Sequence, residues 1–233
     1  NRALIESSIP GLPEPRRGKV RDIYDLGDSL LLVASDRISA FDCVMPNGIP
    51  DKGKVLTGMS LFWFDLLDWM PNHLISADPA DYPEAARKAA DDLDGRSMLV
   101  KKADAIPVEC VARGYLVGSG WKEYQKSGSV CGIQLRPGYS QAEKLEAPIY
   151  TPAYKAEQGH DENISYAQVV ELTDAETAAT LRELTLKLYT TAADYAAERG
   201  ILIADTKFEF GFDKDTVIVI DEILTPDSSR FWP

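Results

Sequence analysis

The stretch ILIADTKFEFGFD, residues 201–213, predicts a long β-strand whose two faces differ in polarity. Side chains alternate between the two faces of a strand. The even-numbered face is apolar from Leu202 to Phe212, and we expect it to lie in the core. The other face begins with isoleucines and ends in the charged row Asp205, Lys207 and Glu209. This row fits a solvated strand end with a Lys207–Glu209 ion pair, and it fits equally the floor of a site that handles phosphate and metal.

The next segment, TVIVIDEILTPDSSR at 216–230, predicts a second strand that forms a hairpin with the first. A three-residue loop, 214–216, is the favoured connection and would place Asp221 opposite Glu209, whereas an even-numbered loop would place Glu222 on that face. Two facing carboxylates repel each other unless a proton or a cation lies between them. Mg²⁺ usually takes one or two protein carboxylates together with phosphate oxygens, so this hairpin is a candidate metal site.

Composition limits the class of protein. The 233 residues include 25 Lys and Arg against 37 Asp and Glu, a net charge of -12, which argues against a nucleic-acid partner. Only two histidines are present, so a metal site must use carboxylates. Three widely spaced cysteines indicate reduced, buried thiols in a cytoplasmic protein. No apolar run approaches the ~20 residues of a membrane span, and no signal peptide opens the chain.

The remaining elements are predicted from their periodicity. We expect a hairpin over 18–34 turning at Gly27-Asp28, an apolar helix over 55–70, a polar helix over 79–93, and strands over 97–116 interrupted at Pro107. A helix over 118–126 should stop at Gly128, and a long helix should start at a capping box of Thr173 and Glu176. Residues 132–165 show no period and are interpreted as a functional or mobile loop.

Three basic or hydroxyl-rich segments could bind phosphate. Lys19 and Arg21 should share a strand face, although a solvated strand end is the more common explanation of such a pair. Arg113 precedes Ser119 at an expected helix start, so Ser119 is either part of an anion seat or a simple N-cap. The turn TPDSSR, 225–230, either caps a helix or strand end or binds phosphate. The sequence contains neither a Walker A motif nor a GxGxxG motif.

Taken together, several motifs resemble one family along nearly the whole chain. They are GKVRDIY (18–24), SDRISAFD (35–42), IPVECVARGYLVGS (106–119), TPAYKAEQGHDENIS (151–165), IADTKFEFG (203–211) and DEILTPDSSRFW (221–232). This set resembles SAICAR synthetase, the phosphoribosylaminoimidazole-succinocarboxamide synthase of purine biosynthesis. The resemblance implies an α+β fold of two lobes, with an ATP cleft between them of the ATP-grasp or kinase-like kind. It implies an N-terminal lobe, 1–104, that is β-rich and contacts the ATP phosphates. The C-terminal lobe, 105–233, would bind metal and ribonucleotide, and it would be incomplete because longer members continue past this sequence.

The resemblance also implies roles for individual residues. The catalytic set would be Asp205, Lys207 and Lys155, with 161–163 closing over the site beside Lys155. The ATP set would be Lys19, Arg21, Lys102, Ile106, Glu209 and Asp221, of which Glu209 and Asp221 would ligate Mg²⁺. The substrate set would be Arg113, Ser119, Asp227, Ser229, Arg230, Asp36, Arg37 and Ser39.

The implied reaction joins carboxyaminoimidazole ribonucleotide to L-aspartate and releases ADP and phosphate. ATP, the ribonucleotide and L-aspartate are therefore the expected small-molecule partners, with no nucleic acid or membrane, and the oligomeric state stays open. The sequence leaves two alternative functions open. One is a kinase-like phosphotransferase, which would not need aspartate, and the other is a nucleotide-binding module that does not turn ATP over.

Overall fold

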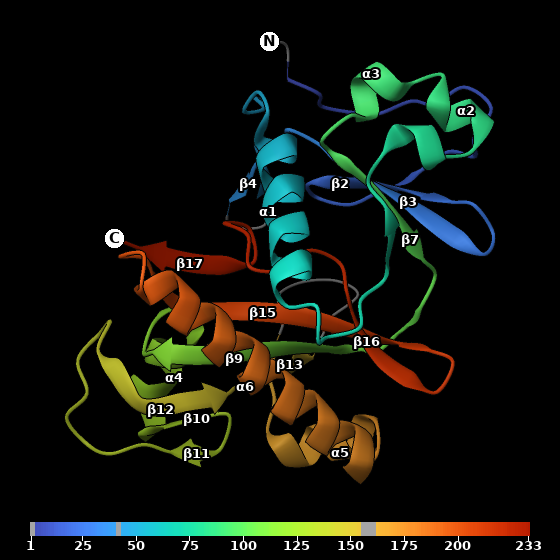
Figure 1. Ribbon diagram of the computed structural model, residues 1–233. Helices are drawn as coiled ribbons and strands as arrows, with labels where there is room; N and C mark the ends of the chain where they lie inside the picture. The colour runs from blue at the N-terminus through green and yellow to red at the C-terminus, as the bar shows by residue number, and fades with distance from the viewer. Residues whose placement is uncertain (1–2, 41–42, 155–161) are drawn as a thin grey trace. The chain divides into compact units, whose positions relative to one another are not determined.

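The computed structural model describes residues 3–40, 43–154 and 162–233. The chain divides into two compact units. The first comprises 1–104 together with 212–218, and the second comprises 105–211 and 219–233. Each unit contains helices and a sheet of antiparallel strands, so the predicted α+β class is confirmed (Figure 1). Among the helices of the described ranges, none is both long enough and apolar enough to cross a membrane.

The first unit is built on a five-stranded sheet. Its strand order is β1 (Arg16–Arg17), β2 (Arg21–Asp25), β3 (Ser29–Ala34), β7 (Ser97–Lys101) and β6 (Leu74–Ser76). The predicted β2–β3 hairpin is confirmed, and its turn is held by the Gly27 N–H donating to Asp25 Oδ1 at 2.9 Å. Lys19 lies in the turn between β1 and β2, before β2 begins, so the prediction that it shares a strand face with Arg21 is wrong.

Helix α1 (Lys52–Leu66) packs on β3 and β7 (Figure 1). The approach is close at Gly53, where an added Cβ would lie 2.1 Å from the Ala34 carbonyl oxygen. The predicted polar helix over 79–93 is instead three short helices: η1 (Pro79–Asp81), α2 (Glu84–Arg87) and α3 (Ala90–Leu93). Tyr82, Ala86 and Leu93 of this segment join residues of the sheet in one core cluster, among them Tyr24, Leu31, Val33 and Leu99. Strands β4 (Ser39–Ala40) and β5 (Cys43–Val44) form a separate pair.

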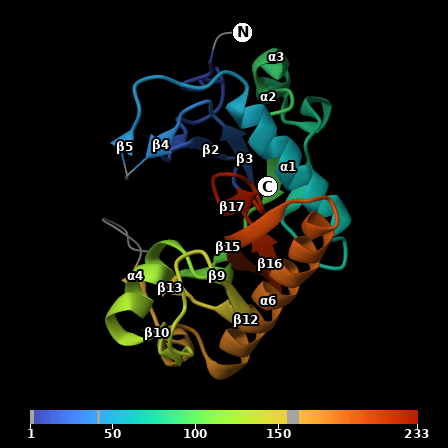
Figure 2. The same ribbon diagram turned by 90° about the vertical axis from the view of Figure 1, so that its left-hand side faces the viewer.

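The second unit is built on a larger sheet. Its order is β14 (Glu162–Asn163), β13 (Ala153–Tyr154), β9 (Val108–Tyr115), β15 (Leu202–Asp213) and β16 (Thr216–Ile220), of which residues 212–218 count with the first unit. Strand β12 (Lys144–Tyr150) also pairs with β9, and β8 (Asp104–Ala105) and β17 (Ser229–Trp232) pair with β15. A small pair, β10 (Ser129–Val130) and β11 (Ile133–Gln134), follows α4 (Gly118–Ser127). Figure 2 shows α4 and α6 on opposite sides of β9.

Strands β11, β12, β13 and β14 interrupt the loop expected over 132–165. Because β11, β13 and β14 are only two residues long, they leave no period for sequence reasoning to detect. Strand β12 shows a mostly exposed pattern in place of strict alternation. Residues 155–161 lie outside the described part, and with them Lys155 and Asp161.

Helix α6 (Ala175–Ala197) covers one side of β9 and β12. Its buried stripe includes Ala178, Leu181, Leu188 and Ala192, as the helical period predicts. The start lies one residue later than expected: the N-cap is Asp174, whose side chain accepts from Thr177 N, and Thr173 instead ends α5 (Tyr166–Leu172). The predicted capping box of Thr173 and Glu176 is therefore wrong.

Strand β15 has the predicted two-faced character. Ala204, Phe208 and Phe210 are fully buried, whereas Lys207 and Glu209 on the other face are half-buried. The β15–β16 connection is a two-residue turn, Lys214-Asp215, and not the predicted three-residue loop. The register that would place Asp221 opposite Glu209 is therefore wrong, since an even-numbered loop pairs odd positions of β15 with even positions of β16. Strand β16 ends at Ile220, and Asp221 follows it with a left-handed φ of 65°.

The cysteines differ from one another. Cys110 and Cys131 are buried, and burial raises the pKa of both thiols to about 12, so they are inert packing residues. Cys43 is exposed, so the expectation of burial is wrong there.

Candidate functional site

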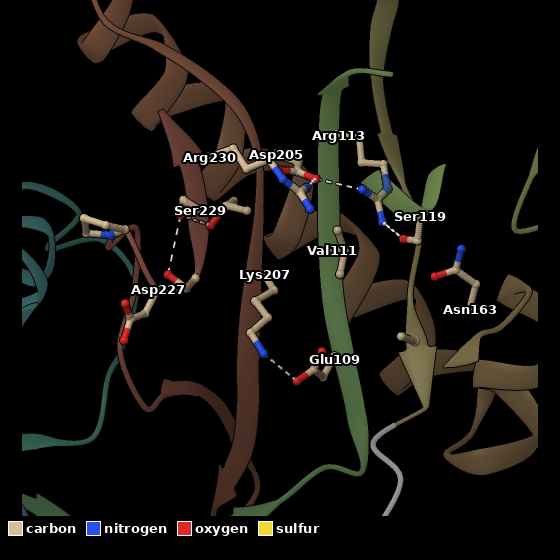
Figure 3. Close-up of a pocket in the computed structure, with 14 residues that line it drawn as sticks. Glu109, Val111, Arg113, Ser119, Asn163, Asp205, Lys207, Asp227, Ser229 and Arg230 are labelled. Carbon is tan, nitrogen blue, oxygen red and sulfur yellow. Dashed lines mark hydrogen bonds and ion pairs between the residues drawn. The ribbon is translucent and has the colours of Figure 1, made fainter. Parts of the chain in front are cut away.

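A pocket of about 340 Å³ lies in the second unit, over β9 and β15. We call it the β9–β15 pocket. Seven residues predicted as site residues line it: Arg113, Ser119, Asp205, Lys207, Asp227, Ser229 and Arg230. They come from three segments, 113–119, 205–207 and 227–230, and Figure 3 shows Arg113, Arg230 and Asp205 close together on neighbouring strands. Asp205 and Lys207 of the charged row on β15 therefore line a pocket, whereas Glu209 does not.

Strand register explains the convergence at Asp205. On β9 its partner is Arg113, and on β17 its partner is Arg230, so three charged residues stand side by side across three strands. A register shift in the β15–β17 pairing between Ile203 and Asp205 produces the second match. The Asp205 side chain is only 6% exposed, so its charge depends on these arginines for compensation.

Arg113 is held by all three of its side-chain nitrogens. Nε donates to Thr151 Oγ1 at 2.9 Å, Nη1 to Asp205 Oδ2 at 2.7 Å, and Nη2 to Ser119 Oγ at 2.9 Å. Burial lowers the pKa of the guanidinium, and the Asp205 charge opposes that shift. The alternative that Ser119 is a simple N-cap is wrong, because Val117 is the N-cap residue and Ser119 accepts from Arg113.

Arg230 contacts the same carboxylate from the opposite side. Its Nη1 donates to Asp205 Oδ2, and half of its side chain is exposed. Figure 3 shows both guanidinium groups pointing at Asp205. Two positive charges share one negative charge, so this cluster carries an excess of positive charge toward the pocket. A partly exposed guanidinium with unused N–H groups is suited to bind phosphate or carboxylate.

A second ion pair lies further along the pocket. Lys207 Nζ donates to Glu109 Oε1 at 2.8 Å, with the lysine side chain 41% exposed and the glutamate side chain 8% exposed (Figure 3). Glu109 was missed as a site residue from the sequence. A usable signal was present, since Glu109, Val111 and Arg113 occupy alternate positions of one strand and must share a face.

The TPDSSR turn is a capping turn and also borders the pocket. Ser228 N and Ser229 N both donate to the Thr225 carbonyl, and Ser228 Oγ accepts from Thr225 N, as in a capping turn. The turn also borders the pocket, and Ser229 Oγ lies 2.7 Å from Thr206 Oγ1 of β15. Asp227 is exposed at the rim.

The predicted metal ligands belong to the second unit but do not line this pocket. Glu209 is half-buried on β15, on the face of Lys207, and Asp221 is half-buried just after β16. The described residues contain no group of three or more His, Cys, Asp or Glu side chains placed to hold a metal. Two carboxylates still match the donor chemistry of Mg²⁺ that is bound mainly through nucleotide phosphate.

The remaining predicted residues are divided between the units. Lys19, Arg21, Lys102, Asp36, Arg37 and Ser39 lie in the first unit, whereas Ile106 lies in the second. Lys102 Nζ donates to Asp25 Oδ2 at 2.6 Å on the surface. The Ile106 N–H donates to the Phe210 carbonyl at 2.9 Å. Ser39 is half-buried in β4.

Asp36 and Arg37 are buried and are engaged within the first unit. Asp36 accepts from Arg96 Nη1 at 2.7 Å and from two backbone N–H groups, at Leu4 and Gly53. Burial would raise the pKa of this carboxyl, but these hydrogen bonds outweigh it and lower the pKa. Arg37 donates to Asp22 Oδ1 at 2.8 Å and to several backbone carbonyls. These contacts favour a role in holding the loop that leads to Ser39.

Comparison with known proteins identifies the family. The family profile described as SAICAR synthetase matches residues 14–233. The chain belongs to the SAICAR synthetase family. The phosphoribosylaminoimidazole-succinocarboxamide synthase of Desulfatibacillum aliphaticivorans is 58% identical over 99% of this chain and 78% of its own length. That of Thermodesulfovibrio yellowstonii is 55% identical over 98% of this chain and 79% of its own length.

Solved structures of SAICAR synthetases share the fold. The chain matches the SAICAR-synthase from Saccharomyces cerevisiae complexed with SAICAR at a TM-score of 0.89 and 45% identity, over 99% of this chain and 79% of that one. A type-2 SAICAR synthetase in complex with ADP matches at a TM-score of 0.77 and 27% identity, over 94% of this chain and 84% of that one. The resemblance stated from the motifs is thereby confirmed, and with it the enzyme class.

Proposed function

We propose that this chain catalyses the reaction of its family, in which a carboxylated aminoimidazole ribonucleotide is joined to L-aspartate with cleavage of ATP to ADP and phosphate. The supporting observation is the β9–β15 pocket, where seven side chains chosen from the sequence motifs converge in one unit. Identity of 58% to a phosphoribosylaminoimidazole-succinocarboxamide synthase over nearly the whole chain supports the same conclusion.

The pocket is suited to an anionic ribonucleotide. Arg230 and Ser119 would bind its charged and hydroxyl groups, with Ser229 and Asp227 at the rim. Arg113 already donates from each nitrogen, so its main contribution would be to fix Ser119 and Asp205 in place. Arg230 is the better-exposed cation and is the residue that we assign to the anionic group of the ligand.

Lys207 is placed to act on the carboxylate that reacts. Its ammonium group is partly exposed to the pocket and is held by Glu109. A carboxylate is a poor electrophile until one of its oxygens is phosphorylated. A bond would form from that oxygen to the γ-phosphorus of ATP, and the bond to the ADP oxygen would break. Lys207 and Arg230 would offset the charge of the transferring group.

The second step forms the new amide. The amino group of L-aspartate attacks the activated carbonyl carbon, the bond to the phosphate oxygen breaks, and the nitrogen loses a proton. No serine or cysteine nucleophile is required. Holding the reactants in register supplies much of the remaining rate enhancement.

The ATP and metal assignments remain part of the proposal. Glu209 and Asp221 would hold Mg²⁺, which would neutralise charge on the phosphates. Lys19 and Arg21 would contact the phosphates. The adenine would meet backbone groups of 102–105, since the Ile106 N–H already has an acceptor. Lys155 would act at the reacting carboxylate.

The test measures ADP release with the ribonucleotide and L-aspartate each present or omitted. Release that requires both supports the proposed ligase. Release without aspartate would indicate a kinase-like phosphotransferase, and binding of ATP without release would indicate a non-catalytic module.

Contaminating ATPases need a control in that assay. A Lys207→Met variant should lose ADP release, whereas Lys126→Met, which changes an exposed lysine on α4, should not. Equal release by both variants and the parent would show that the activity does not come from this pocket.

A further inference from the structure

Helix α4 begins with a Gly118-Ser119-Gly120 segment that lies against both arginines of the pocket. Gly118 has a left-handed φ of 57°. A Cβ added to it would lie 2.6 Å from Arg230 Nη2 and 3.0 Å from both Cζ and Nη1. Real Cβ atoms essentially never come as close as 2.6 Å to another atom, so a side chain at 118 would displace the guanidinium. Because that group is the far end of a flexible, half-exposed side chain, it can move aside at little cost to the fold, but it then leaves its place beside Asp205.

Gly120 shows a weaker form of the same relation. Its added Cβ would lie 3.1 Å from Arg113 Cδ and Nε, which is tight but tolerable. Ser119, between the two glycines, accepts from Arg113 Nη2. One three-residue segment therefore contacts both guanidinium groups that bind Asp205.

We infer that Gly118 is a positioning residue for Arg230. It leaves space in which the guanidinium can lie beside the backbone, with Nη2 nearest to Gly118, while Nη1 stays on Asp205. The half-exposed Arg230 side chain would otherwise be free to choose among many rotamers. The expected effect of Gly118 on ribonucleotide affinity rests on the proposed function, whereas the contact between Gly118 and Arg230 does not.

The chain offers a matched control at the other end of the same helix. Gly128 follows α4 with a φ of 70°, and a Cβ added there would meet nothing within 4 Å. Gly118→Ala and Gly128→Ala therefore impose similar backbone strain, but only the first collides with Arg230. The difference between the two variants isolates the collision.

The experiment titrates carboxyaminoimidazole ribonucleotide into each variant by calorimetry, without ATP or aspartate. Gly118→Ala should raise the Kd about tenfold, the loss of roughly one charge-assisted hydrogen bond, while Gly128→Ala leaves it unchanged. In turnover, the KM for the ribonucleotide should rise in Gly118→Ala while the KM for ATP does not. When Arg230→Ala is also present, Gly118→Ala should change the Kd no more than Gly128→Ala does.

Thermal unfolding gives a readout that does not depend on any ligand, measured on the parent, Gly118→Ala, Gly128→Ala, Arg230→Ala and the double variant Gly118→Ala with Arg230→Ala. Gly118→Ala should lower the Tm slightly more than Gly128→Ala, because it displaces Arg230 from Asp205, and Arg230→Ala should remove this small excess. If Gly118→Ala does not fold, the double variant with Arg230→Ala must fold for the inference to stand. Equal effects of Gly118→Ala with and without Arg230 would overturn it. A parent protein that neither binds the ribonucleotide nor turns over would overturn the proposed function and leave this unfolding test intact.

Discussion

The two units each bury an arginine on an aspartate, and the two pairs serve different ends. In the first unit Arg37 binds Asp22 at 2.8 Å, and in the second Arg113 binds Asp205 at 2.7 Å. All four side chains are less than one-tenth exposed. By sequence alone Arg37 and Arg113 look equally suited to hold a substrate.

The surrounding contacts separate the two pairs. Arg37 donates to the backbone carbonyls of Ile5, Gly18, Lys19 and Arg21, and both oxygens of Asp22 accept from within the unit. Asp205 instead accepts from a second arginine that is half exposed and lines a pocket. A buried pair saturated by backbone groups holds chain segments together, whereas a pair that shares its charge with an exposed cation is available to a ligand.

The largest expected effect is on stability and follows from removing Arg37. Arg37→Ala should lower the free energy of unfolding by about 3–5 kcal/mol, because it leaves Asp22 buried without its counter-charge. Denaturant titration measures this loss. Lys88→Ala, which removes an exposed pair with Glu84 at 2.9 Å, should cost less than about 1 kcal/mol. A loss below about 1 kcal/mol for Arg37→Ala would erase the distinction between the two clusters.

The next effect is on binding and follows from removing Arg230. Arg230→Ala should raise the Kd for carboxyaminoimidazole ribonucleotide by roughly 10–100-fold, the worth of a hydrogen bond to a charged group. Its effect on unfolding should stay under about 1 kcal/mol, since Arg113 still compensates Asp205. Calorimetry and denaturant titration on one preparation test both parts. If Arg230→Ala lowered the free energy of unfolding but left the Kd unchanged, the Arg230–Asp205 contact would be structural, like the Arg37–Asp22 pair of the first unit.

A third prediction concerns pH and His73, in the first unit. The residue is 3% exposed, Nε2 has no hydrogen-bond partner among the described residues, and burial lowers the pKa of the imidazole to about 3. The folded pKa lies below the unfolded value of 6.5, so the neutral form is favoured in the fold. Stability from this site is therefore complete above pH 6.5 and is lost as the pH falls, by about 2 kcal/mol at pH 5. Denaturant titrations of the parent and of His73→Phe at pH 7.5 and 5.0 test this prediction. Between these pH values the variant should lose about 2 kcal/mol less free energy of unfolding than the parent. Identical pH dependence would refute it.

The smallest effect is expected at Ser119. Ser119→Ala removes one of the acceptors of Arg113 and should weaken ribonucleotide binding by about 1 kcal/mol, or roughly fivefold. Ser127→Ala, at the other end of α4, is the matched control and should leave the Kd unchanged. The contrast would fail if both serines behaved alike in calorimetry.

Short-range signals in the sequence predicted much of the fold. The β2–β3 hairpin, the stop of α4 at Gly128 and the two faces of β15 all follow from residues close in the chain. Elements of two residues, such as β13 and β14, are too short to show a period. The α6 start was misplaced by one residue because Thr173 and Asp174 are both good N-cap residues.

The sequence did not reveal site contacts that depend on which residues of two paired strands lie opposite each other. Glu109 reaches Lys207 only because β9 and β15 pair across almost one hundred residues of chain. The backbone carbonyls that surround Arg37 have no signature in the sequence at all. Residues such as Arg113 and Asp205 could be chosen because the family resemblance supplied the missing long-range information.

The placement of 212–218 with the first unit has a practical consequence for dissecting the molecule. The polypeptide passes from one unit to the other after 104, after 211 and again after 218. Neither unit is thus one uninterrupted segment, and a gene cut at codon 104 would not encode an intact half. To express the first unit alone, a gene would have to join residues 212–218, the tip of the β15–β16 hairpin, to residues 1–104. To express the second unit alone, a gene would have to replace residues 212–218 with a linker between 211 and 219.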